Sequence, residues 1–173
     1  MAYAYSGSIG SSVNGFAAFL SGAASYFIPI SLSGIIAEST FINKLNILNQ
    51  LDIFVETYGS ISLNVNHLKM LNKDTQKALS VLIEKNLVKV LYLSDEGNEL
   101  FEALKTLLSY DEALSLAQAI DSNTNIVVVD SEDAKVIAVK LGIIPISYEE
   151  FLLKAYQQGL VNSKKILNIM FGK

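Results

Sequence analysis

The stretch NIVVVDSEDAKVIAVKLGI, Asn125–Ile143, decides the fold class of this 173-residue chain. Its first half is a run of β-branched residues that ends in a carboxylate, which predicts a buried strand over 125–130 with Asp130 at its carboxyl end. Its second half, 131–142, has the apolar pattern of a helix and stops at Gly142. A buried strand followed directly by a helix is the unit from which parallel sheets are built.

The same alternation continues on both sides of this stretch. Four further apolar runs are typical of strands, at 33–38, 60–65, 87–93 and 143–147. Segments with helical spacing lie between and after them, at 39–59, 66–86 with a break near Asn72, 95–108, 109–121, 148–161 and 162–172. The sequence therefore predicts an α/β fold with a central parallel sheet covered by helices on both faces, a three-layer α/β/α arrangement. Pro145 favours an edge position for the last strand.

The composition excludes several classes of site. There is no cysteine, which excludes disulfides, zinc–thiolate sites and thiol catalysis, and His67 is the only histidine, which disfavours a Ser-His-Asp triad. All 13 basic residues are lysines and the net charge is −4, so the chain has no basic stripe of the kind that binds duplex nucleic acid. We expect a cytoplasmic protein.

Residues 1–37 carry no charged side chain. A signal peptide is disfavoured because no basic residue precedes the apolar part. A membrane span is disfavoured because Ser21, Gly22, Ser25 and Pro29 interrupt it. A disordered tail would normally carry more charge. We therefore predict an N-terminal arm over 1–33, followed by a domain over 34–173. Such an arm would cover apolar surface on its own domain, on another copy in a homo-oligomer, or on a separate protein partner.

Acidic residues fall where the predicted strands end. Glu38 ends the first strand and Asp130 ends the strongest one, while Asp111 and Glu112 open the helix before it and Asp133 lies one turn beyond. In parallel sheets, ligands bind outside the carboxyl ends of the strands. Carboxylates crowded there repel one another unless a cation lies between them, and hard oxygen ligands suit Mg²⁺ or Mn²⁺. The candidate metal ligands are Asp130, Glu112, Glu38 and Asp133, and the first three are the candidate catalytic residues.

Each of these acids also has a structural interpretation. Asp130 would cap the helix that begins at Ser131, and Glu112 and Glu38 would be first-turn acids favoured by the helix dipole. Asp133 would be a solvated helix acid. His67 would lie at the surface or in the core with its hydrogen bonds satisfied. Spacing alone does not choose between these interpretations and a metal site.

The segment DEALSLAQAIDSNTNIVVVDSEDAKVIAVKLGIIPISYEEFLLKAYQQGLV, residues 111–161, resembles the C-terminal half of PIN-domain proteins. The likeness is closest to a nucleic-acid-binding PIN-like branch related to VapC-type toxins. The elements that carry it are Glu112–Ala117, Ile126–Asp130, Leu141–Gly142 and Gly159–Val161. The first half matches more loosely, through IIAESTFINKLNILNQLDIF and LVKVLYLSDEGNELFEAL, so the resemblance covers about residues 34–161.

The resemblance implies an acidic cluster that binds Mg²⁺ or Mn²⁺ and cleaves RNA. Glu112 and Asp130 match acids of the family, and Glu38 matches its first aspartate in one register, whereas another register places Ala37 there. A further family acid would fall within 64–71, which has no carboxylate; the nearest polar residues there are Asn64, Asn66 and His67. Losing an acid removes both a ligand and a charge that holds the cation.

Two hypotheses for the function follow. The first is a Mg²⁺- or Mn²⁺-dependent ribonuclease, related to toxins of toxin–antitoxin pairs, with an incomplete acidic site and RNA as its partner. The second is a catalytically inactive PIN-like module for interaction or assembly that uses the apolar arm. Membrane association through the arm is a weaker third possibility.

Overall fold

The computed structural model describes residues 34–172. The uncharged arm predicted over 1–33 lies outside the described residues, together with the predictions made for it.

Within the described part of the chain, five parallel strands form one sheet in the order β3-β2-β1-β4-β5. The strands are short and lie inside the five predicted ranges: β1 Ile35–Ile36, β2 Ile61–Asn64, β3 Val88–Leu91, β4 Ile126–Val128 and β5 Ile144–Ile146. The central strand β1 is fully buried, as expected of a strand covered on both faces. Pro145 lies in β5 at one edge of the sheet, as its missing amide requires. The predicted parallel α/β architecture is confirmed.

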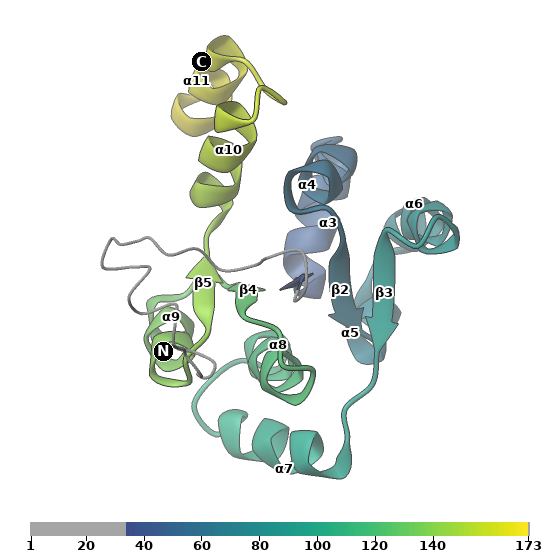
Figure 1. The fold of residues 1–173 in the computed structure, drawn as a ribbon, viewed down its shortest axis with the longest axis vertical. Coiled ribbons are helices and arrows are strands. Elements are labelled where there is room, and N and C mark those ends of the chain that lie inside the picture. Colours follow the sequence, from purple (N-terminus) through teal and green to yellow (C-terminus); the bar gives the residue numbers. More distant parts are fainter. Residues whose placement is uncertain (1–33, 173) are drawn as a thin grey trace, which may run out of the picture. The chain divides into compact units, whose positions relative to one another are not determined.

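Helices connect and follow the strands (Figure 1). Their bounds are α3 Ser39–Ile47, α4 Leu51–Tyr58, α5 Val65–Met70, α6 Lys73–Glu84, α7 Asp95–Leu104, α8 Tyr110–Asp121, α9 Glu132–Lys140, α10 Tyr148–Gln157 and α11 Ser163–Phe171. The prediction of one helix over 39–59 is wrong. The chain turns at Asn49, whose φ of 55° is tolerated by asparagine but ends the regular helix, and α4 begins two residues later. The predicted break near Asn72 is confirmed, because Asn72 caps α6 through the Thr75 amide.

Two apolar layers enclose the sheet. Ile36, Val127 and Val129 pack with apolar side chains of α7, α8 and α9 in one buried cluster. A second cluster consists of aromatic rings from α3, α4 and α10 in edge-to-face or tilted contact, namely Phe41, Phe54, Tyr58, Tyr148 and Phe151. Side chains of successive strand residues point to opposite faces, which is why uninterrupted apolar strands supply both layers. The two layers hold the ends of β1 and β4 in place.

A close contact between α7 and α8 gives a test of the packing. Asp121 accepts hydrogen bonds from the Ser94 amide at 2.8 Å and from the Ser94 hydroxyl, and a Cβ on Gly97 would lie 2.6 Å from its carboxyl carbon. Glycine to alanine within a helix normally stabilises by about 1 kcal/mol. Gly97→Ala is instead expected to lower the free energy of unfolding in urea by about 1–2 kcal/mol, because Asp121 must leave Ser94. Glu99→Ala, at an exposed position of the same helix, is the control, and a more stable Gly97→Ala protein would contradict the contact.

Candidate functional site

The acidic side chains meet at the edge of the sheet where the strands end. Glu38 lies two residues after β1, at the N-cap of α3, and Asp130 lies two residues after β4. Asp111 and Glu112 lie in the first turn of α8. Asp111, Glu112 and Asp130 are close enough to raise the pKa of the Glu38 carboxyl by charge repulsion. The structure thus gathers acids that are far apart in the sequence. Asp133 is exposed in the first turn of α9 and is not among the charges that act on Glu38.

Glu38 is the most perturbed of these acids. Its side chain is 6% exposed. Oε1 accepts a hydrogen bond from the Thr40 hydroxyl at 2.9 Å, whereas Oε2 has no hydrogen-bond partner among residues 34–172. Burial, and then repulsion by the neighbouring acids, raises the pKa of Glu38 to about 7, although the bond from Thr40 works in the opposite direction. A buried carboxylate with a free oxygen is costly, so this residue is poised to take up either a proton or a cation.

Asp111 serves α3 as a cap supplied from another helix. Its two oxygens accept from the Ser39 hydroxyl at 2.8 and 3.0 Å, and Oδ2 accepts from the Thr40 amide at 3.3 Å. Nε2 of His67 lies 3.2 Å from Oδ1. Burial alone would raise the pKa of Asp111, but the bonds from His67 and Ser39 outweigh it and hold the pKa below its usual value. The sequence predicts that Asp111 lies at this edge but indicates no role for it, because its partners are distant in the chain.

Glu112 joins α8 to α9. It forms a capping box with Ser109, the N-cap of α8, with 2.7 Å between the Ser109 hydroxyl and Oε2. Its other oxygen accepts a hydrogen bond from the Ser131 hydroxyl. Ser131 is also the N-cap of α9, accepting from the Ala134 amide at 3.1 Å. The structural interpretation of Asp130 as the cap of α9 is therefore wrong, and Asp130 remains an exposed carboxylate at the end of the strand segment.

Asparagine and histidine side chains are the nearest polar groups to the position where the resemblance places a further acid. Asn64 caps α5 through the Asn66 amide at 2.8 Å and donates to Gln118 Oε1 at 2.6 Å. His67 is fully buried, with Nε2 against Asp111 and Nδ1 without a hydrogen-bond partner in the described structure. The histidine therefore belongs to the core, and its ring is directed at one of the site's acids.

The carboxylates do not form a ready-made metal cage. Within residues 34–172, no group of three or more His, Cys, Asp or Glu side chains is arranged to hold a metal ion. Glu112 and Asp111 already accept hydrogen bonds from serine, threonine or histidine, which turns their oxygens toward protein donors. In the same described part, no helix has the length and apolar character needed to cross a bilayer.

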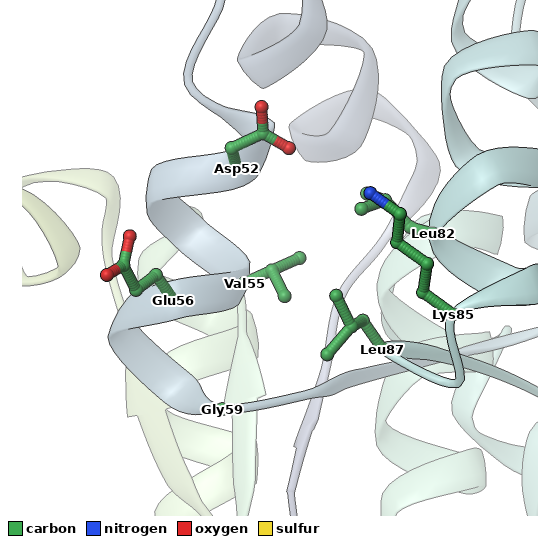
Figure 2. A pocket seen from close by; sticks show the side chains of 7 residues that line it. All are labelled: Asp52, Val55, Glu56, Gly59, Leu82, Lys85 and Leu87. Atoms are coloured by element: carbon green, nitrogen blue, oxygen red, sulfur yellow. The ribbon is translucent and has the colours of Figure 1, made fainter.

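A hollow on the side of the sheet where the strands begin is separate from this site. It has a volume of about 420 Å³ and lies between α4 and the end of α6, where β2 and β3 begin (Figure 2). Val55, Leu82 and Leu87 supply its apolar surface, with Asp52 on one side and Lys85 on the other. In a parallel sheet the strand beginnings and strand ends lie at opposite edges, so this hollow is separate from the acids.

A comparison with protein families identifies the fold that presents these acids. A family model described as a PIN domain matches residues 34–172, which is the whole of the described part of the chain. A search of curated proteins finds no match. The family match covers the sheet, both helical layers and the acidic edge, and it agrees with the resemblance seen in the sequence. The chain belongs to the PIN domain family.

Proposed function

We propose that this protein is a ribonuclease dependent on Mg²⁺ or Mn²⁺, and that Glu38, Glu112 and Asp130 bind the ion. The PIN domain is commonly a nuclease fold, which sets the class of reaction. The observation that carries the proposal is the Glu38 side chain, which is buried, has one oxygen without a partner among residues 34–172, and feels the charges of three further carboxylates. A divalent cation at this point would offset both the burial and the repulsion that together raise the pKa of Glu38.

The residues fit such an ion in chemistry but must rearrange to bind it. Hard oxygen donors are what Mg²⁺ and Mn²⁺ prefer. Glu38 already offers a free oxygen, and Asp130 is exposed and able to turn. Glu112 must give up or share its bond from Ser131. Because the described residues 34–172 contain no preformed cage, we expect weaker binding than at a preformed site.

The roles of the protein groups follow from their contacts. When bound, the ion would activate a water molecule and stabilise the charge that develops on the phosphodiester. Glu38, Glu112 and Asp130 would hold and orient it. Asp111 accepts hydrogen bonds from Ser39 and Thr40 in the first turn of α3, and these bonds restrain the backbone that carries Glu38. Since Glu38 must lose its proton to bind a cation, metal affinity and cleavage are expected to rise as the pH increases through about 7.

Removal of one acid tests this assignment. Asp130→Asn is expected to lower Mn²⁺-dependent cleavage of single-stranded RNA at least about ten-fold, because the substitution removes a ligand and a charge at the site. Cleavage is measured with labelled RNA in Mn²⁺ and in EDTA. Glu132→Gln, an exposed acid that pairs with Lys135 at 3.3 Å, is the matched control and should leave the rate unchanged. Equal rates for the wild-type and Asp130→Asn proteins, or full activity in EDTA, would refute the assignment.

A second candidate function is an interaction or assembly module without catalysis. One observation favours it: the helix that follows β2 supplies His67, bound to Asp111, where the resemblance expects a metal-binding acid. In this case the uncharged residues 1–33 would bind a protein partner or another copy of the chain. Light scattering after size exclusion separates the possibilities, because deletion of residues 1–32 should then lower the mass of the assembly to that of one chain. An unchanged subunit number after the deletion would exclude this role for the arm.

A further inference from the structure

His67 is buried, yet it bonds to an acid at the edge of the site. Its side chain is 0% exposed on α5. Nε2 lies 3.2 Å from Asp111 Oδ1, 3.2 Å from the Asp111 carbonyl oxygen and 3.5 Å from the Ser115 hydroxyl. The first two neighbours are acceptors only, which assigns the proton of the ring to Nε2. His67 therefore donates to Asp111 and ties α5 to the first turn of α8.

Asp111 in turn binds the first residues of α3. It accepts from the Ser39 hydroxyl and from the Thr40 amide, which fixes the first turn of that helix. Thr40 in turn donates its hydroxyl to Glu38 Oε1 at 2.9 Å. Thr40 thus donates a hydrogen bond to each acid, from its backbone amide to Asp111 and from its hydroxyl to Glu38. A continuous path of hydrogen bonds runs from the buried histidine to the candidate metal ligand.

The path also decides which Glu38 oxygen is free. Oε1 is occupied by Thr40, so Oε2 is the atom left without a partner among the described residues. An acid in place of His67 would add a carboxylate against Asp111 and would have no proton to donate to it near neutral pH. A histidine at this position holds Asp111 instead of repelling it.

We propose that His67 is a positioning residue which, through Asp111 and Thr40, holds the Glu38 carboxylate with one oxygen directed at the cation site. The part that concerns the cation rests on the proposed function. The part that concerns the placement of Glu38 does not, and it can be measured without metal.

Two substitutions of His67 separate hydrogen bonding from packing. His67→Leu fills the space without a donor, whereas the amide nitrogen of His67→Gln reaches the place of Nε2 and donates to Asp111. In EDTA, the carboxyl carbon signals of Asp111 and Glu38 are followed by NMR across a pH titration. In His67→Leu the pKa of Asp111 should rise toward its ordinary value and the Glu38 signal should move, and His67→Gln should restore both. Mn²⁺ affinity, from calorimetry, should fall about ten-fold in the leucine variant only, as for other residues that orient metal ligands.

The possible results distinguish failure of the positioning role from failure of the proposed metal-dependent function. If the Asp111 and Glu38 signals stay in place in His67→Leu, or if the leucine and glutamine variants weaken Mn²⁺ binding equally, the positioning role is overturned. If the signals respond as expected but the wild-type protein binds no Mn²⁺, the proposed metal-dependent function fails while the placement of Glu38 by His67 stands.

A second pair of variants at an exposed position keeps the test possible if His67→Leu does not fold. Thr40 is exposed, so Thr40→Val removes only the hydroxyl that reaches Glu38, and Thr40→Ser retains it. We expect Thr40→Val to move the Glu38 signal and to weaken Mn²⁺ binding about ten-fold, while Thr40→Ser resembles the wild-type protein. A Glu38 signal identical in all three proteins would disprove the path at its last step.

Discussion

Asp111→Asn is expected to lower the free energy of unfolding at pH 7 by about 3 kcal/mol, measured by urea denaturation. The buried carboxylate accepts hydrogen bonds from the Ser39 hydroxyl, the Thr40 amide and His67 Nε2. The asparagine amide keeps one acceptor oxygen and turns an N–H group toward at least one of these donors. Buried donors left without an acceptor account for the loss, and the charge that favours the start of α3 disappears as well.

The pH dependence of this loss has a definite sign. The pKa of Asp111 in the folded protein lies below its ordinary value of 3.8. The stabilisation by its ionised form is therefore complete above the ordinary value and is lost as the pH falls through the folded pKa. The difference between the wild-type and Asp111→Asn proteins should shrink below about pH 4. It should also narrow as the pH rises through about 7, because the Asp111 charge contributes to the raised pKa of Glu38 in the wild-type protein only. Asp74→Asn, an exposed first-turn acid of α6, is the control, and an equally large loss there would contradict a special role for Asp111.

The sequence predicted those features of the fold that depend on neighbouring residues. Apolar runs located all five strands, because a strand buried on both faces leaves a continuous signal in the chain. The helix predicted over 109–121 was located for a similar reason, because its apolar spacing is local, and α8 begins at Tyr110 directly after its N-cap Ser109. The error at 39–59 has a local cause: apolar residues continue at helical spacing through Leu48 and Leu51, and one asparagine in the left-handed region interrupts them.

The contacts that organise the site were not predictable in this way. Asp111 meets Ser39 across 72 residues of sequence and His67 across 44. Neither pairing has a pattern of spacing that reveals it, and a single histidine in a sequence indicates neither burial nor a partner. The acids at the strand ends were predictable as a group, because parallel strands end at a common edge. Which acid would be buried with a free oxygen, and which would cap a helix, depends on the packing of α3, α5 and α8.

Glu38→Gln is expected to make the protein more stable at pH 8, by about 3 kcal/mol in the free energy of unfolding. Burial raises the pKa of Glu38 from 4.5 to about 7 in the folded protein, so the folded state binds this proton more tightly than the unfolded chain does. The stability associated with the protonated form is complete below pH 4.5 and is lost as the pH rises through about 7. Glutamine stays neutral at every pH and removes this dependence. The two proteins should be similar near pH 4.5 and diverge up to pH 8 in urea titrations with EDTA.

Added Mn²⁺ distinguishes a cation site from a carboxyl that is merely buried. At pH 8, saturating Mn²⁺ should stabilise the wild-type protein and leave Glu38→Gln unchanged, because a ligand that binds only the folded state adds its binding free energy to the stability. Glu56→Gln, at an exposed position of α4, should show the wild-type response to both pH and Mn²⁺. A Glu38→Gln protein less stable than the wild type at pH 8 in EDTA would mean that the Glu38 carboxylate is ionised and well paired. The repulsion from which the cation site is inferred would then not exist.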